Sequence, residues 1–315
     1  MPARCRGSSS ERDRPLYDQV TSNKRRSALL IGAFVVLIAL LGMAFSLAIG
    51  FGPVGVVIAV LVAGGLAFTS YWKSDSIALA MSRAHPADPQ VYARLHNLIE
   101  GLCIASGTPV PRLYVVDDPA PNAFATGRNP RHAAIAVTTG LLEKMNRVEL
   151  EGVLAHELSH IRNYDILVST LAVTLVGAAA LLSDFGIRFM WFGGGRRSSD
   201  GGGGTNPILL VGALLLLVLA PILATMMQLA ISRRRESLAD MSAVEITRYP
   251  PGLIAALEKL RDDETVVHSG NRATAHLWIE EPVPTRDDTE RAKRWTHLFN
   301  THPPIEDRIA ALREL

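Results

Sequence analysis

The residues best suited to chemistry in this sequence are His156, Glu157 and His160, which form the pattern His-Glu-x-x-His. In a helix, side chains four positions apart lie on one face, so both imidazoles would approach the same divalent ion. Glu157 would then lie where a carboxylate can accept a proton from a water molecule at that ion. The spacing therefore predicts a zinc-dependent hydrolytic site, although a five-residue motif can also arise by chance and needs support from its surroundings.

The residues around the motif predict the helix that it requires. Asn146 and Glu149 have the spacing of a capping box, with Asn at the N-cap and Glu three positions later. Gly152 would allow another element to approach the helix closely, at some cost in helix propensity. An apolar face for packing is provided by Val148, Leu150, Val153, Leu154, Leu158 and Ile161.

A catalytic zinc ion needs a third protein ligand and one open position. Glu236 and Asp240 are four residues apart and would share one helical face. One carboxylate would bind the ion, while the other would orient a ligating histidine. Alternatively, Glu236 pairs only with the preceding arginines, Arg233–Arg235, and the spacing alone leaves both possibilities open.

Long apolar segments surround these candidate site residues. Residues 27–72 contain no Asp, Glu, Lys or Arg, and glycines and a proline near the middle supply a turn, which predicts a transmembrane hairpin over 28–72. A cleaved signal peptide is the alternative for its first half. Uncharged runs at 166–183 and 207–231 predict a second hairpin within 166–232, with a Gly-rich loop, although the first of these runs could instead be a buried or half-inserted helix.

Basic residues beside the apolar segments predict their orientation. The clusters at 24–26, at Lys73 and Arg83, and at 233–235 point to the cytoplasm, whereas Arg188, Arg196 and Arg197 in the second loop conflict with this assignment. We therefore expect a mostly helical, membrane-embedded protein with about four transmembrane helices. Residues 73–165 and 233–315 are expected to form a cytoplasmic α+β catalytic domain, and residues 1–27 a disordered basic tail.

The overall composition excludes other classes. The 315 residues carry a formal net charge of +2, which gives no reason to expect nucleic acid as a partner. The two cysteines, Cys5 and Cys103, are too few and too distant for a disulfide framework or a metal clip. A transporter is disfavoured because the long apolar segments contain no ionisable residue.

Several ordered blocks together resemble the HtpX-type membrane zinc metalloproteases, which belong to the larger group that contains the Ste24 prenyl-protein endopeptidases. The resemblance covers roughly residues 28–315. The matching blocks are the His-Glu-x-x-His motif with Ile161–Asp165, Ser232–Asp240, Asn122–Gly127, Val137–Leu142 and Thr301–Arg308.

This resemblance implies a zincin-like (gluzincin) catalytic domain with one zinc ion per chain, held by His156, His160 and Glu236, with Asp240 behind a ligand. It implies a multi-pass protein of the bacterial inner membrane whose active site faces the cytoplasm. The implied activity is that of a zinc metalloendopeptidase that cleaves misfolded or membrane-associated polypeptides in quality control under stress. The alternatives are prenyl-protein processing, as in Ste24, a signal-transducing membrane protease, and a catalytically inactive scaffold.

The resemblance also assigns roles beyond the metal ligands. His302 and Arg308 match positions expected to stabilise the oxyanion opposite the zinc. Residues 132–138 read as a strand, and the resemblance places it as the edge strand that pairs with the substrate backbone through Ile135 and Val137. The alternative for this strand is a plain core strand. Asn122 is expected to help shape the cleft.

Overall fold

The computed structural model describes residues 52–171, 233–263, 265, 278–279 and 304–315, together with isolated positions between 25 and 39. The first element with described bounds is helix α2 (Gly52–Met81). It is followed by strand β1 (His85–Pro86), α3 (Ala93–Ser106) and β2 (Arg112–Val116). Strands β3 (Ala123–Gly127) and β4 (Ala133–Thr138) are joined by the short 3-10 helix η1 (Pro130–His132). The remaining elements are α4 (Thr139–Lys144), α5 (Arg147–Arg162), α8 (Arg233–Thr247), α9 (Pro250–Arg261) and α11 (Ile305–Arg313).

The strands form a mixed sheet in the order β1-β2-β4-β3. Strand β4 pairs in parallel with β2 and antiparallel with β3, so Ile135 lies opposite Leu113 on one side and Ala125 on the other. Alternate residues of β4 face opposite sides of the sheet. Ile135 and Val137 join the core beneath α3 and α5, whereas Ala134 and Ala136 join a smaller cluster with the end of α2.

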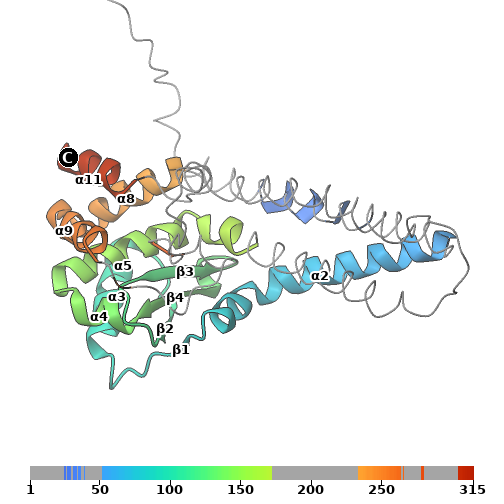
Figure 1. The fold of residues 1–315 in the computed structure, drawn as a ribbon, viewed down its shortest axis with the longest axis horizontal. Coiled ribbons are helices and arrows are strands. Elements are labelled where there is room, and N and C mark those ends of the chain that lie inside the picture. Colours follow the sequence, from blue (N-terminus) through green and yellow to red (C-terminus); the bar gives the residue numbers. More distant parts are fainter. Residues whose placement is uncertain are drawn as a thin grey trace, which may run out of the picture.

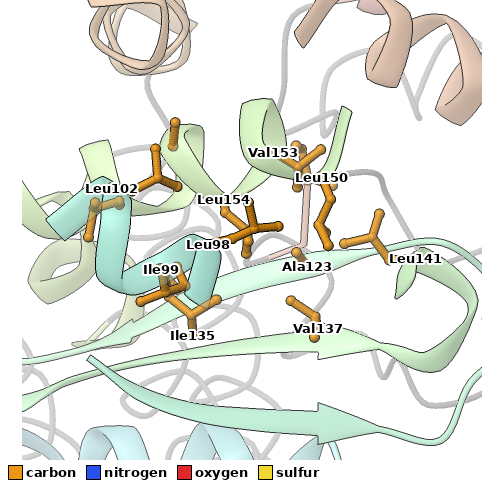
Figure 2. Close-up of a cluster of buried hydrophobic side chains, with 14 of the residues drawn as sticks. Leu98, Ile99, Leu102, Ala123, Ile135, Val137, Leu141, Leu150, Val153 and Leu154 are labelled. Atoms are coloured by element: carbon orange, nitrogen blue, oxygen red, sulfur yellow. The ribbon is translucent and has the colours of Figure 1, made fainter. Parts of the chain in front are cut away.

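Helix α5 lies between the sheet and the helices of the second half of the chain (Figure 1). Figure 2 shows leucine and valine side chains of α5 and α3 filling the space above the strands. On its other sides α5 packs against α8 and α9. Residues from Glu149 to Ile161 are therefore almost all buried, the polar His156, Glu157 and Ser159 included.

Two glycines allow α5 and α9 to cross closely. A Cβ on Gly152 would lie 2.8 Å from the backbone nitrogen of Leu253, and a Cβ on Gly252 would lie 2.8 Å from the carbonyl oxygen of Val148. Both distances are too short for real Cβ contacts. The close approach expected at Gly152 is thus confirmed, and its partner is the start of α9.

Helix α2 contains the second of the expected apolar segments and continues past it to Met81. It extends away from the sheet and the other helices (Figure 1). Within the part of the chain that the structure describes, no helix meets the combined length and hydropathy expected of a membrane span. The rest of the expected hairpins, most of 28–49 and all of 172–232, lies outside the described residues.

Candidate metal centre

The local sequence before α5 fixes where this helix begins. The side-chain oxygen of Asn146 accepts hydrogen bonds from the backbone N–H groups of Val148 (2.9 Å) and Glu149 (3.0 Å). The Glu149 carboxylate accepts in return from the backbone N–H of Asn146, at 2.8 Å. The expected capping box is confirmed, and the helix that it starts continues to Arg162, beyond both histidines of the motif.

His156 and His160 point their Nε2 atoms at the same place. These two nitrogens are 3.2 Å apart. Glu236, at the start of α8, brings its carboxylate oxygens to 3.6 Å from His156 Nε2 and 3.7 Å from His160 Nε2. A tetrahedral ion with bonds of about 2.0–2.1 Å would hold its ligand atoms about 3.3–3.4 Å apart. The three donors therefore have the types and separations of a zinc site.

Carboxylates hold the opposite nitrogen of each histidine. Asp240 Oδ1 lies 2.9 Å from His156 Nδ1, and Asp165 Oδ2 lies 3.2 Å from His160 Nδ1. A carboxylate is an acceptor only, so in the neutral imidazole each Nδ1 carries the hydrogen and each Nε2 has its lone pair toward the centre. Asp240 therefore contacts a histidine as expected. Asp165 was not singled out from the sequence, and its only signal was a carboxylate directly after the helix that bears His160.

The charges around His156 favour a cation at this centre. Burial by itself would lower the pKa of His156, but the hydrogen bond that its ring donates to Asp240 and the negative charge of Asp240 raise the pKa to about 9. Burial likewise opposes the raised pKa of His160, which Glu236 and Asp165 cause. The raised pKa values mean that the negative charges around the two histidines favour a positive charge there. A metal cation is favoured for the same reason and competes with the proton for the imidazole nitrogen.

Arg308, on α11, lies against His156 and is paired with Asp240. Its Nε donates to Asp240 Oδ2 at 2.9 Å and its Nη2 donates to Asp240 Oδ1 at 2.6 Å. The same Nη2 is 3.4 Å from His156 Nδ1 and 3.5 Å from His156 Nε2. The side chain is buried, and the oxyanion role expected for it stays a prediction. His302, expected to share that role, lies outside the described residues.

The pKa values of this ion pair reflect its mutual contacts. Burial by itself would raise the pKa of Asp240, but the charge and hydrogen bonds of Arg308 lower it to about 2. Burial opposes the raised pKa of Arg308, to which Asp240, Glu236 and Glu157 contribute by their negative charges. Glu157 is 2% exposed, so the expected proton acceptor lies inside this charged and largely dry environment.

The strand expected at the edge of the sheet is a central strand. β4 is bonded to β2 on one side and to β3 on the other, and Ile135 and Val137 are both 0% exposed. Its backbone therefore has no side left for a substrate, and the expected substrate contacts of Ile135 and Val137 are wrong. Small and β-branched residues suit a central strand as well as an edge strand, so their pattern could not decide the position.

The strand at this edge is β3, which runs beside α5. At its start, the Ala123 carbonyl accepts from the backbone N–H of Ile279 at 3.0 Å. At its end, the Gly127 N–H donates to Thr170 Oγ1 at 3.3 Å. The outer side of β3 is thus engaged at both ends by residues distant in sequence.

Asn122 joins the start of β3 to the end of β4. Its backbone N–H donates to Thr138 Oγ1 at 2.8 Å, and its carbonyl accepts from the backbone N–H of Thr138 at 2.9 Å. Its side-chain oxygen accepts from the backbone N–H of Ala123 at 3.0 Å. These contacts hold the two strands together, and the side chain itself is buried.

Comparisons with known proteins agree with this geometry. A profile of peptidase family M48 matches residues 89–315. The chain is 46% identical over 305 residues to a protein described as a protease HtpX homolog of Streptococcus mutans, covering 95% of this chain and 100% of that protein. A protein of the same description from Ligilactobacillus salivarius is 43% identical over 302 residues, with the same coverage.

A solved structure shares the fold. The crystal structure of S. mikatae Ste24p superposes with a TM-score of 0.50 at 21% sequence identity. The similarity covers 94% of this chain and 66% of that longer chain. At this level of identity, the likeness concerns the arrangement of the elements.

Proposed function

This chain belongs to peptidase family M48, and from that premise we propose that it is a membrane-bound zinc endopeptidase that cleaves misfolded or membrane-associated polypeptides on the cytoplasmic side. The single observation that carries this proposal is the convergence of two histidine Nε2 atoms and the Glu236 carboxylate beside the buried Glu157. Two imidazoles and one carboxylate, with a position left for water, form the donor set of hydrolytic zinc sites.

In this proposal His156, His160 and Glu236 hold the ion. A zinc ion bound there would polarise the scissile carbonyl and lower the pKa of water to about 7. Zinc is preferred over harder ions because imidazole nitrogens make up most of the donor set. Asp240 and Asp165 keep both histidines in the tautomer that presents Nε2.

Glu157 serves as the general base. It accepts a proton from the attacking water and later delivers that proton to the leaving amine. Its location next to His156 on α5 brings the carboxylate to the metal donors without a separate element. Since the surroundings are largely buried, the proton is exchanged between Glu157 and the substrate rather than with bulk solvent.

The substrate is proposed to be an extended polypeptide that adds to the outer side of β3. None of the described strands pairs with that side, whose described hydrogen bonds lie at its two ends, and β3 runs beside the catalytic helix α5. An extended chain can pair by its backbone regardless of most of its side chains. Such recognition suits unfolded proteins, which expose extended segments of many sequences.

The membrane attachment is supported by the sequence and by α2. Residues 27–72 carry no charged side chain. Along α2, Val57, Leu61 and Phe68 are 58–70% exposed, which is unfavourable in water unless lipid or protein covers them. The basic clusters that flank the apolar segments support a catalytic domain on the cytoplasmic side.

The test compares the full-length protein with its Glu157→Gln variant, both purified in detergent with chelator and then supplied with zinc and unfolded casein. We expect cleavage by the wild type only, after zinc addition, with equal zinc content in the two proteins. Glu151→Gln, on the same helix, is the matched control and should cleave normally. Equal cleavage by wild type and Glu157→Gln would overturn the assigned base, and absence of bound zinc from both would overturn the metal centre.

A prenylated peptide in the same assay tests the alternative of prenyl-protein processing. Cleavage of that peptide without cleavage of casein would replace quality control by a processing function. Cleavage of casein and of the unprenylated peptide at similar rates supports the broader specificity.

A further inference from the structure

The character of the α2 surface changes at Trp72. Before this residue the described side chains are mostly exposed and apolar, Val57 and Phe68 among them. After Lys73 the helix carries polar residues and buried residues. Ala78 and Leu79 pack in the core cluster that contains Phe124. Trp72 is 47% exposed and contacts the rings of both Phe68 and Tyr71.

The start of a second apolar segment contacts the turn after β3. Thr170 belongs to the uncharged run that begins at Ile166. Its Oγ1 lies 3.1 Å from Thr126 Oγ1 and accepts from the Gly127 N–H. Both apolar segments therefore meet the domain at the carboxyl end of β3.

Between these segments lies the turn 127–132, which joins β3 to β4 and carries Arg128 and Arg131. We call it the basic turn. Gly127 has a φ of +139°, and a Cβ there would collide with the His132 carbonyl oxygen. The Asn129 side chain accepts from the backbone N–H of His132 at 3.0 Å and so caps η1. The basic turn is consequently held in one conformation by its own residues.

Arg128 is fixed against Trp72. Its guanidinium carbon lies 4.6 Å from the centre of the indole ring, and its Nη1 donates to the Trp72 carbonyl at 3.3 Å. A stacked guanidinium keeps its remaining N–H groups directed outward in a planar fork. Two exposed positive charges are added by Arg131, in the same turn as Arg128, and by Lys73, which follows Trp72 in the chain.

The sequence around the basic turn contains no negative charge to compensate its arginines. No acidic residue occurs between Asp118 and Glu143. Asp75, two residues after Lys73, is buried and paired with Arg112. Arg128 and Lys73 thus lie next to Trp72 and the exposed apolar side chains of α2, and Arg131 follows in the same turn.

We infer that the basic turn binds the phosphate of anionic phospholipids, with Arg128 and Arg131 as the contacting residues. The inference rests on the proposed membrane attachment and adds a lipid preference to it. Arginine binds phosphate through paired N–H donors, and tryptophan favours the level of the headgroups. A lipid fits better than a soluble phosphate because the exposed apolar side chains of α2 adjoin the charges. Each arginine near an anionic leaflet is expected to contribute about fivefold to the local enrichment.

The experiment measures which lipid lies at Trp72. The full-length protein is reconstituted into vesicles of phosphatidylcholine and phosphatidylglycerol in one fixed ratio. Bromine on the acyl chains quenches tryptophan fluorescence on contact. One set of vesicles carries it on phosphatidylcholine and the other on phosphatidylglycerol, with the same mole fraction of brominated lipid in both. The contribution of Trp72 is the difference between the quenching of the wild type and that of Trp72→Phe.

We expect brominated phosphatidylglycerol to quench Trp72 more strongly than brominated phosphatidylcholine, and high salt to reduce the difference. Arg128→Gln combined with Arg131→Gln should abolish it. The matched control is Arg147→Gln, which changes an exposed arginine at the start of α5 and should preserve the difference in quenching. Folding of each variant is checked by its zinc content.

The outcomes separate the two proposals. Equal quenching by both lipids, or a preference that survives in the double arginine variant, would overturn the lipid inference and leave the membrane attachment supported. No quenching of Trp72 by either lipid would overturn the proposed membrane placement of α2 itself.

Discussion

Arg308 and Asp240, 68 residues apart in the chain, form a two-pronged ion pair inside the protein, and Asp240 in turn contacts His156 Nδ1. The last helix of the chain, α11, thereby reaches the metal centre through α8. Arg308 Nη2 is also 3.4 Å from Nδ1 and 3.5 Å from Nε2 of His156. We therefore interpret Arg308 as a residue that positions Asp240 and His156.

Removing Arg308 should destabilise the protein strongly. Arg308→Ala leaves the Asp240 carboxylate buried without its partner, which typically costs about 3–5 kcal/mol. Thermal unfolding in detergent should show a large decrease in midpoint. The matched control is Arg313→Ala, which breaks the exposed pair with Glu258 and should cost about 0–1 kcal/mol. Similar midpoints for both variants would contradict the role of Arg308.

The carboxylates behind the histidines should set the zinc affinity. We expect Asp240→Asn and Asp165→Asn each to weaken zinc binding by about 10–100-fold, since a neutral amide supports the imidazole less well. Competition with a chromogenic chelator measures this effect directly. Asp262→Asn, at an exposed aspartate after α9, should leave the affinity unchanged. Unchanged affinity in both Asp240→Asn and Asp165→Asn would show that the histidines need no such support.

The crossing of α5 and α9 should not tolerate a methyl group. Gly152→Ala brings a Cβ to 2.8 Å from the Leu253 backbone, and such overpacking typically costs about 1–3 kcal/mol. In contrast, Gly101→Ala on the exposed side of α3 meets nothing within 4 Å and should stabilise the helix by about 0.5–1 kcal/mol. Opposite shifts in the unfolding midpoint are the expected result. Shifts of the same sign would contradict the described crossing.

Cys103 should react only slowly with thiol reagents in the folded protein. Burial raises the pKa of its thiol from 9.0 to about 11, so little thiolate forms near neutral pH. In a Cys5→Ser background, reaction with a thiol reagent should be slow until denaturant is added. Because the folded state holds the thiol proton more tightly, the associated stability is complete below pH 9 and is lost as the pH rises toward 11. Rapid reaction of the native protein would refute the assigned burial.

Features that depend on neighbouring residues could be predicted from the sequence. The capping box of Asn146 and Glu149, the helix that follows, and the placement of His156 and His160 on one face all arise from interactions within one turn of helix. The pattern of β4 likewise predicted a strand. The blocks shared with the HtpX-type proteases identified the family before any distance was known.

Contacts between residues distant in the chain could not be predicted and came from the packing of whole elements. The parallel crossover that places β4 between β2 and β3 excluded Ile135 and Val137 from a substrate edge, although their types suit either position. The packing of α8 and α11 against α5 and α9 brought Arg308 to Asp240 and Asp240 to His156. Such partners depend on how whole elements pack, and the free energy of that packing is spread over many side chains, so no local spacing encodes it.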